Sequence, residues 1–171
     1  MTAPIRWYLA YGSNMCRARL EARVGPCVAG GPAWLSGYDL RFHKRGRDGS
    51  GKCDAFATGD AADVVHGVLF GMNPGQCEAL HGFEGPDYAV ATVTVMHADG
   101  ERRAFLYLAR ASAIDASLAP FDWYHAFVIE GARRESLPES YVARLAAVSA
   151  MADPDAVRAR TNAEILKQVL R

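Results

Sequence analysis

Apolar and β-branched residues gather in short runs over the first 110 positions, and turn residues separate these runs. Runs of this length and spacing are typical of strands. We expect strands over residues 5–10, one or two within 28–45, and further strands over 64–72, 88–97 and 103–108. Asp99-Gly100 is a strong turn signal, which indicates that the last two of these strands form a hairpin.

Helical patterns are short in the first half of the chain and dominate after residue 120. We expect short helices over 15–23, after Gly12-Ser13-Asn14, and from Pro74 to about His81. Longer helices are expected over 121–134, 139–151 and 153–171. Because strands and helices segregate along the chain, the pattern predicts an α+β fold. We expect a single domain over 1–171, with a strand-rich core at about 5–112 and C-terminal helices at about 120–171.

The charge balance argues against several classes of function. The 171 residues include 19 basic and 19 acidic side chains, so the formal net charge is zero. Nucleic-acid binding needs a surplus of cations on one face of the protein. No apolar run reaches the roughly 20 residues that span a bilayer, and the N-terminal segment lacks the apolar core of a signal peptide. We therefore expect a cytoplasmic protein without a nucleic-acid or membrane partner.

The cysteines form no C-x-x-C pair and lie far apart, at positions 16, 27, 53 and 77. This spacing predicts free, mostly buried thiols rather than a zinc or redox site. Cys77, His81 and Glu84 are spaced to share a face of an unbroken helix, which is one way to hold a metal. However, Gly82 and Gly85 disfavour a helix beyond His81, and no fourth ligand follows. We expect no bound metal.

Residues 46–53, GRDGSGKC, nearly match the phosphate-binding loop G-x-x-x-x-G-K-[ST]. Cys53 stands where that motif requires a magnesium-binding Ser or Thr, and the residues after it are a poor start for a helix. We therefore expect no nucleotide or other cofactor. The better interpretation is a flexible basic loop over 44–52 that is dispensable for catalysis.

Two segments place polar groups where chemistry needs them. In 8–15 a strand ends in Gly-Ser-Asn and leads into a helix, which points backbone N–H groups at one spot and suits a carboxylate or an oxyanion. In 80–88 Glu84 lies at a helix-to-strand junction, where partly apolar surroundings would raise its pKa towards the range of proton transfer. Both segments are also compatible with a purely structural role, as a common turn and as a solvated loop glutamate.

Three motifs, in this order and spacing, resemble the γ-glutamylcyclotransferase family over roughly residues 5–150: YLAYGSNM at 8–15, GFEGPDYAVATVTV at 82–95 and WYHAFVIEGARRESLPESYVARL at 123–145. The resemblance implies a small mixed β-barrel flanked by helices. It also implies an acyltransferase- or lyase-type cyclisation. In that reaction the γ-glutamyl group of an amino acid, amine or glutathione-like substrate closes to 5-oxoproline and the free amine is released. Such a ring closure needs positioning and proton transfer, and no cofactor.

By position, the resemblance makes Glu84 the catalytic glutamate, which we expect to act as general acid and base. It assigns the contacts with the small-molecule γ-glutamyl substrate to Tyr8, Leu9, Ala10, Tyr11, Gly12, Ser13, Asn14 and Tyr124, with Tyr88 as a further candidate for the pocket wall. The proline at 86 and the basic loop 44–52 depart from the family pattern.

Some choices stay open at this level. The alternative to an enzyme is a non-catalytic member of the same fold that binds a small ligand. The sequence does not decide whether an amino acid, cysteinylglycine, a lysine side chain or a polyamine is the leaving amine. A homodimer is compatible with the sequence, and the oligomeric state stays open, as do the roles of loop 44–52 and the last helix.

Overall fold

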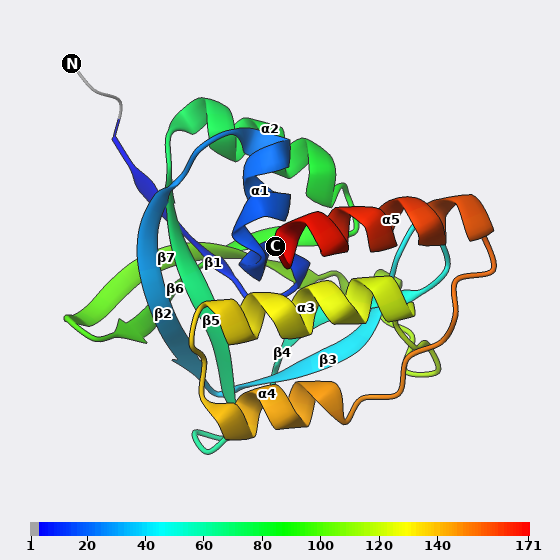
Figure 1. The fold of residues 1–171 in the computed structure, drawn as a ribbon. Coiled ribbons are helices and arrows are strands. Elements are labelled where there is room, and N and C mark those ends of the chain that lie inside the picture. Colours follow the sequence, from blue (N-terminus) through cyan, green and yellow to red (C-terminus); the bar gives the residue numbers. More distant parts are fainter. Residues whose placement is uncertain (1–3) are drawn as a thin grey trace.

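The strands of the first half of the chain close into a five-stranded barrel, and helices cover one side of it (Figure 1). The computed structural model describes residues 4–171, so the first three residues of the predicted domain 1–171 lie outside the description. In order round the barrel, the strands are β1 (Arg6–Ala10), β5 (Val64–Met72), β2 (Val28–Ser36), β6 (Tyr88–His97) and β7 (Gly100–Ala109). The β1–β7 pair is parallel and the others are antiparallel, which confirms the α+β fold with a mixed barrel.

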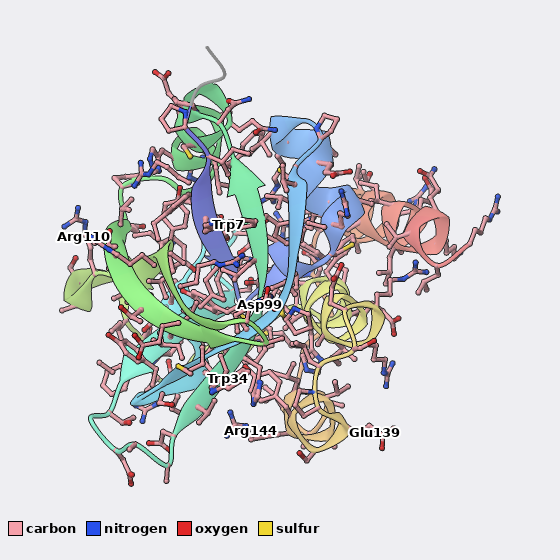
Figure 2. All side chains as sticks on the ribbon, turned by 90° about the vertical axis from the view of Figure 1, so that its left-hand side faces the viewer. Trp7, Trp34, Asp99, Arg110, Glu139 and Arg144 are labelled. Carbon is pink, nitrogen blue, oxygen red and sulfur yellow. The ribbon has the colours of Figure 1, made fainter. Side chains whose placement is uncertain are left out.

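A separate two-stranded hairpin, β3 (Tyr38–Arg45) and β4 (Gly51–Ala57), lies beside the barrel. The helices are α1 (Arg17–Val24), α2 (Pro74–Glu84), α3 (Asp122–Arg134), α4 (Glu139–Ala146) and α5 (Ala156–Val169), with short 3-10 turns η1 (Ser13–Met15) and η2 (Ala111–Ala113). In Figure 2 the barrel, with Trp7 and Trp34 labelled, lies to one side of α3, α4 and α5. Among residues 4–171, no helix is long and apolar enough to cross a membrane.

The core joins the barrel to α3. Leu9 and Phe70 from the barrel and Phe127 from α3 are almost completely buried, and burial of each such side chain is worth about 1.5–3 kcal/mol. Gly131 of α3 lies directly on η1, because a Cβ at this position would stand 2.6 Å from the backbone nitrogen of Cys16. This close contact holds the turn that follows β1. All four cysteines are buried and free, as expected.

The structure corrects the predicted ends of three helices. Helix α2 continues to Glu84, three residues beyond the expected end, because Gly82 is tolerated inside it and Gly85, with φ +75°, provides the stop. Helix α4 ends at Ala146 rather than 151, and the chain then extends so that Met151 pairs with Phe121 at the start of α3. Helix α5 begins at Ala156 and is capped by Asp155.

The bounds predicted for the loop, 44–52, are also wrong. Lys44 lies in β3, and Gly51 and Lys52 open β4, a strand that the sequence pattern did not predict. Only residues 46–50 form the connecting turn, which is closed by a hydrogen bond from Gly46 N to Ser50 O of 2.8 Å. The expected glycine-rich loop is therefore the tip of a β-hairpin.

Candidate active site

A cavity of about 260 Å³ lies where three parts of the fold meet. One side is formed by the turn after β1 together with the end of α2, which we call the motif wall (residues 8–14 and 83–84). The other is formed by residues 44–53 of the β3–β4 hairpin, which we call the hairpin wall. The start of α3 and part of α1 complete the lining, through Trp123, Tyr124, Arg19 and Arg23.

The structure brings most of the predicted site residues to this cavity. Those that line it are Tyr8, Tyr11, Gly12, Ser13, Asn14, Glu84, Tyr88 and Tyr124. Leu9 and Ala10 do not line it, because both are fully buried in the core. Their prediction as substrate contacts followed from the contiguity of the motif. Leu9 points to the face of the strand opposite that of Tyr8, and Ala10 is enclosed in the core.

Glu84 and Asn14 are the centre of the motif wall. The amide nitrogen of Asn14 donates to Glu84 Oε1 at 2.9 Å and lies 3.2 Å from the hydroxyl of Tyr8. Arg23 donates to the amide oxygen of Asn14 at 3.1 Å, which fixes the orientation of that amide. The glutamate is thus held by a neutral donor, with an arginine one residue further away.

Burial raises the pKa of Glu84, although Arg23, the Asn14 hydrogen bond, Lys44 and Arg19 act in the opposite direction. Desolvation disfavours the carboxylate, so the protonated form persists to higher pH than in an exposed glutamate. A carboxyl group with this property accepts and returns a proton more readily near neutral pH.

Cys53 on β4 fixes two tyrosines that face the cavity. Its backbone nitrogen donates to the Tyr124 hydroxyl at 3.1 Å, and its carbonyl accepts from the Tyr88 hydroxyl at 2.6 Å. Burial raises the pKa of both tyrosines well above the ordinary value, so both stay neutral phenols. Gly12 packs against Cys53: a Cβ on Gly12 would stand 3.1 Å from Cys53 Cβ. The two walls therefore meet at Gly12 and Cys53.

The hairpin wall carries charged groups that sequence reasoning placed in a flexible loop. Lys44, Arg47, Asp48 and Lys52 all line the cavity. Lys52 Nζ donates to Asp48 Oδ2 and to Ser50 Oγ, each at 2.8 Å, and stands 4.5 Å from the ring centre of Tyr124. These contacts place the predicted loop in the wall of the cavity, and its mobility stays a prediction. No local sequence signal shows that a turn between two strands is folded against a distant helix.

The alternative of a metal held by Cys77, His81 and Glu84 is not favoured by the side-chain contacts. The three residues do lie on one helix, because α2 continues to Glu84. However, His81 Nδ1 is 2.5 Å from the hydroxyl of Tyr107, and Glu84 faces Asn14. Within residues 4–171, no group of three or more His, Cys, Asp or Glu side chains is arranged to hold a metal ion.

Comparison with known proteins gives a family pattern for the middle of the chain. The model of the AIG2-like family matches residues 64–145, a range that includes Glu84, Tyr88 and Tyr124. No curated protein matches the chain at a significant level.

Solved structures resemble the chain over nearly its whole length. A γ-glutamyl cyclotransferase superposes with a TM-score of 0.85 and 24% identity, covering 96% of this chain and 99% of that one. An uncharacterised human protein gives a TM-score of 0.80 and 23% identity, with 95% and 98% covered. A yeast γ-glutamyl cyclotransferase specific to glutathione gives a TM-score of 0.55 and 13% identity, with 96% of each chain covered. The resemblance drawn from the sequence motifs is confirmed at the level of the fold: the chain has the fold of a γ-glutamyl cyclotransferase over nearly its whole length, and it carries the AIG2-like pattern over residues 64–145.

Proposed function

We propose that the protein is a γ-glutamylcyclotransferase, which cyclises the γ-glutamyl group of its substrate to 5-oxoproline and releases the free amine. The observation that carries this proposal is the placement of Glu84. Its carboxylate stands on the wall of a cavity, 2.9 Å from the amide of Asn14 in the Gly-Ser-Asn turn, and burial raises its pKa. A module that only binds a ligand has no need of a carboxyl group in this state.

The proposed reaction needs one group that moves a proton twice. Glu84 takes a proton from the α-ammonium group of the substrate, and the freed amine attacks the γ-carbonyl carbon. The new C–N bond closes a five-membered ring, and Glu84 gives its proton to the leaving nitrogen as the bond to that nitrogen breaks. Glu84 then takes the second proton from the ring nitrogen and passes it to the released amine, which leaves a neutral lactam and an ammonium group. Atoms and charge balance without water or a cofactor. Ring closure within one molecule has a large effective concentration, so positioning supplies much of the acceleration.

The motif wall has the groups that this reaction requires besides the base. The first N–H groups of η1 have no partner inside that turn, and they suit an oxyanion or the substrate carboxylate. The neutral hydroxyls of Tyr8, Tyr88 and Tyr124 can orient a polar substrate without adding charge. Asn14 holds Glu84 on the same side of the cavity as the turn.

The test is Glu84→Gln, assayed for release of 5-oxoproline from a panel of γ-glutamyl compounds. We expect kcat to fall by about 10²–10⁴, as for a lost general acid–base, with the circular dichroism unchanged. Glu78→Gln is the matched control, because Glu78 lies on the same helix, is exposed and does not line the cavity. If Glu84→Gln and the control both turn over normally, or if no γ-glutamyl compound yields 5-oxoproline, the proposed function is wrong.

A further inference from the structure

Trp123, near the start of α3, lines both the cavity and a groove between α3 and α5. The residue is only 8% exposed. The centre of its ring lies 5.0 Å from Lys52 Nζ and 5.8 Å from the guanidinium carbon of Arg19, and both distances are within the range of cation–π attraction. The indole therefore packs against one cation of the hairpin wall and against another that donates to Ser13 of the motif wall.

Asp153, on the segment before α5, binds the polar edge of this indole. Trp123 Nε1 donates to Asp153 Oδ2 at 2.8 Å, and Arg158 donates to both carboxylate oxygens, each at 2.6 Å. The side chain of Asp153 is completely buried. The hydrogen bonds, above all those from Arg158, hold the pKa of Asp153 well below its usual range, so it stays a carboxylate at neutral pH. Hydrogen bonds to a charged acceptor are strong and directional, so the carboxylate fixes the orientation of the indole.

The backbone keeps the segment that carries Asp153 beside the start of α3. Met151 N donates to Pro120 O, and Asp122 N donates to Met151 O, each at 2.9 Å. In Figure 1 this segment connects α4 with α5 at the end of the molecule where α3 begins. The segment lies beyond residues 64–145, the range of the AIG2-like pattern. Because these backbone bonds do not involve the carboxylate, its removal changes the support of the indole more than the path of the chain.

We propose that Asp153 is a positioning residue, whose carboxylate orients the indole of Trp123 as a wall of the cavity. Asp153 itself does not line the cavity, so it reaches the cavity through the indole. The inference rests on the proposed function, since the orientation of this wall matters for turnover only if the cavity is the active site. It also gives the last helix a role, because Arg158 of α5 holds the carboxylate that holds the indole.

A double-mutant cycle tests whether Asp153 acts through Trp123. We expect Asp153→Ala to raise KM for a γ-glutamyl substrate about tenfold and to leave kcat within about threefold, because the hydrogen bond between Glu84 and Asn14 is untouched. Trp123→Phe, which removes the N–H donor, should raise KM to a similar extent. The double variant should be no worse than the worse single variant, because the second change has no contact left to break. Effects on KM that simply add would overturn the inference.

Fluorescence of Trp123 gives a readout that does not need turnover. The chain has three tryptophans, and Trp7 and Trp34 lie on the barrel away from the cavity (Figure 2), so replacing both by Phe leaves Trp123 as the reporter. In this background Asp153→Ala should raise the acrylamide quenching constant about threefold, because the indole loses the partner of its N–H group. The matched control is Asp155→Ala: Asp155 lies two positions further on and caps α5, and in the described part of the chain it makes no hydrogen bond with Trp123. This control should lower the melting temperature and leave KM and quenching unchanged.

The outcomes separate this inference from the proposed function. If Asp153→Ala lowers the melting temperature but leaves KM and quenching unchanged, Asp153 serves the fold alone and the inference is wrong. If Asp153→Ala does not fold, the same measurements are made on Asp153→Glu, which keeps a charge for Arg158 but moves the acceptor oxygens by one methylene group. If no γ-glutamyl compound yields 5-oxoproline, the proposed function is wrong. The quenching then decides: a rise supports the positioning of Trp123 by Asp153, and an unchanged value overturns it.

Discussion

The two walls of the cavity hold their charged groups in different ways. On the motif wall, Glu84 is held by the neutral amide of Asn14, and no cationic nitrogen of residues 4–171 lies within 4 Å of its carboxylate. On the hairpin wall, Lys52 and Asp48 form a direct ion pair of 2.8 Å. Glu84 is a half-buried carboxyl without a contacting cation, and desolvation raises its pKa above that of an exposed glutamate, whereas Lys52 and Asp48 hold their charges in direct contact. The first arrangement suits proton transfer and the second suits the recognition of charge.

The largest effect on stability is expected at the ion pair of the hairpin wall. The side chains of Lys52 and Asp48 are only 16% and 13% exposed, so Lys52→Met leaves a buried carboxylate without its partner. We expect a loss of about 3 kcal/mol in the free energy of unfolding, measured by urea denaturation. The double variant Lys52→Met/Asp48→Asn should lose less than the single one, because no uncompensated charge remains.

An exposed ion pair, Arg133 and Glu130, is the control against which the loss at Lys52→Met is compared. Arg133 and Glu130 are 2.7 Å apart, but the arginine side chain is 56% exposed, so Arg133→Met should cost no more than about 1 kcal/mol. A loss at Lys52→Met that is no larger than this would mean that the hairpin wall is open to water. It would then be the mobile segment that the sequence pattern suggested.

The two walls also differ in how far the sequence predicts them. Strands 64–72 and 88–97 were predicted with correct bounds, because the first is a mostly buried apolar run and the second alternates along its length as a strand with one face towards solvent does. Strand β4 was missed because Asp54, in its middle, is fully buried and looks like a loop residue in the sequence. In the structure it binds His43 at 2.8 Å and the backbone nitrogen of Ala109 at 2.8 Å. Such partners are distant in the sequence, so the local pattern cannot show them.

In the candidate site, too, the local sequence pattern predicts only some of the residues. It predicts the motif turn and Glu84, since both lie at the junction of a helix and a strand. The role of Cys53 depends instead on contacts with Tyr88 and Tyr124, 35 and 71 positions away. Lys44 looks like a solvated basic residue in the sequence and is buried only because the hairpin folds against the barrel.

A smaller effect, on catalysis, is expected at Asn14 of the motif wall. Its hydrogen bond favours the ionised form of Glu84, so Asn14→Ala should raise the pKa of Glu84 further. The acidic limb of the kcat/KM profile should therefore move to higher pH, and kcat should fall about tenfold because Glu84 is less well oriented. Ser13→Ala, which removes an acceptor of Arg19 but no hydrogen bond to Glu84, should leave the limb in place. A limb that stays in place in Asn14→Ala as well would mean that Glu84 is not the group whose ionisation controls the rate.

The smallest expected effect is on the melting temperature, which should change in opposite directions when Glu84 of the motif wall and Lys52 of the hairpin wall are replaced. In the folded protein the pKa of Glu84 lies above its unfolded value, so the ionised carboxylate opposes folding at pH values above the folded pKa. Glu84→Gln removes this cost and should raise the melting temperature at pH 7, where each kcal/mol corresponds to about 2–4 °C in a chain of this length. The gain should shrink as the pH falls towards 4, because both folded and unfolded forms of Glu84 then become protonated.

At the same pH of 7, Lys52→Met should instead lower the melting temperature. A residue whose removal stabilises the fold and abolishes turnover is retained for its chemistry, whereas one whose removal destabilises the fold is retained for its structure. Equal losses of melting temperature in the two variants would show that Glu84 serves the fold, as the ion pair does, and would remove the distinction between the walls.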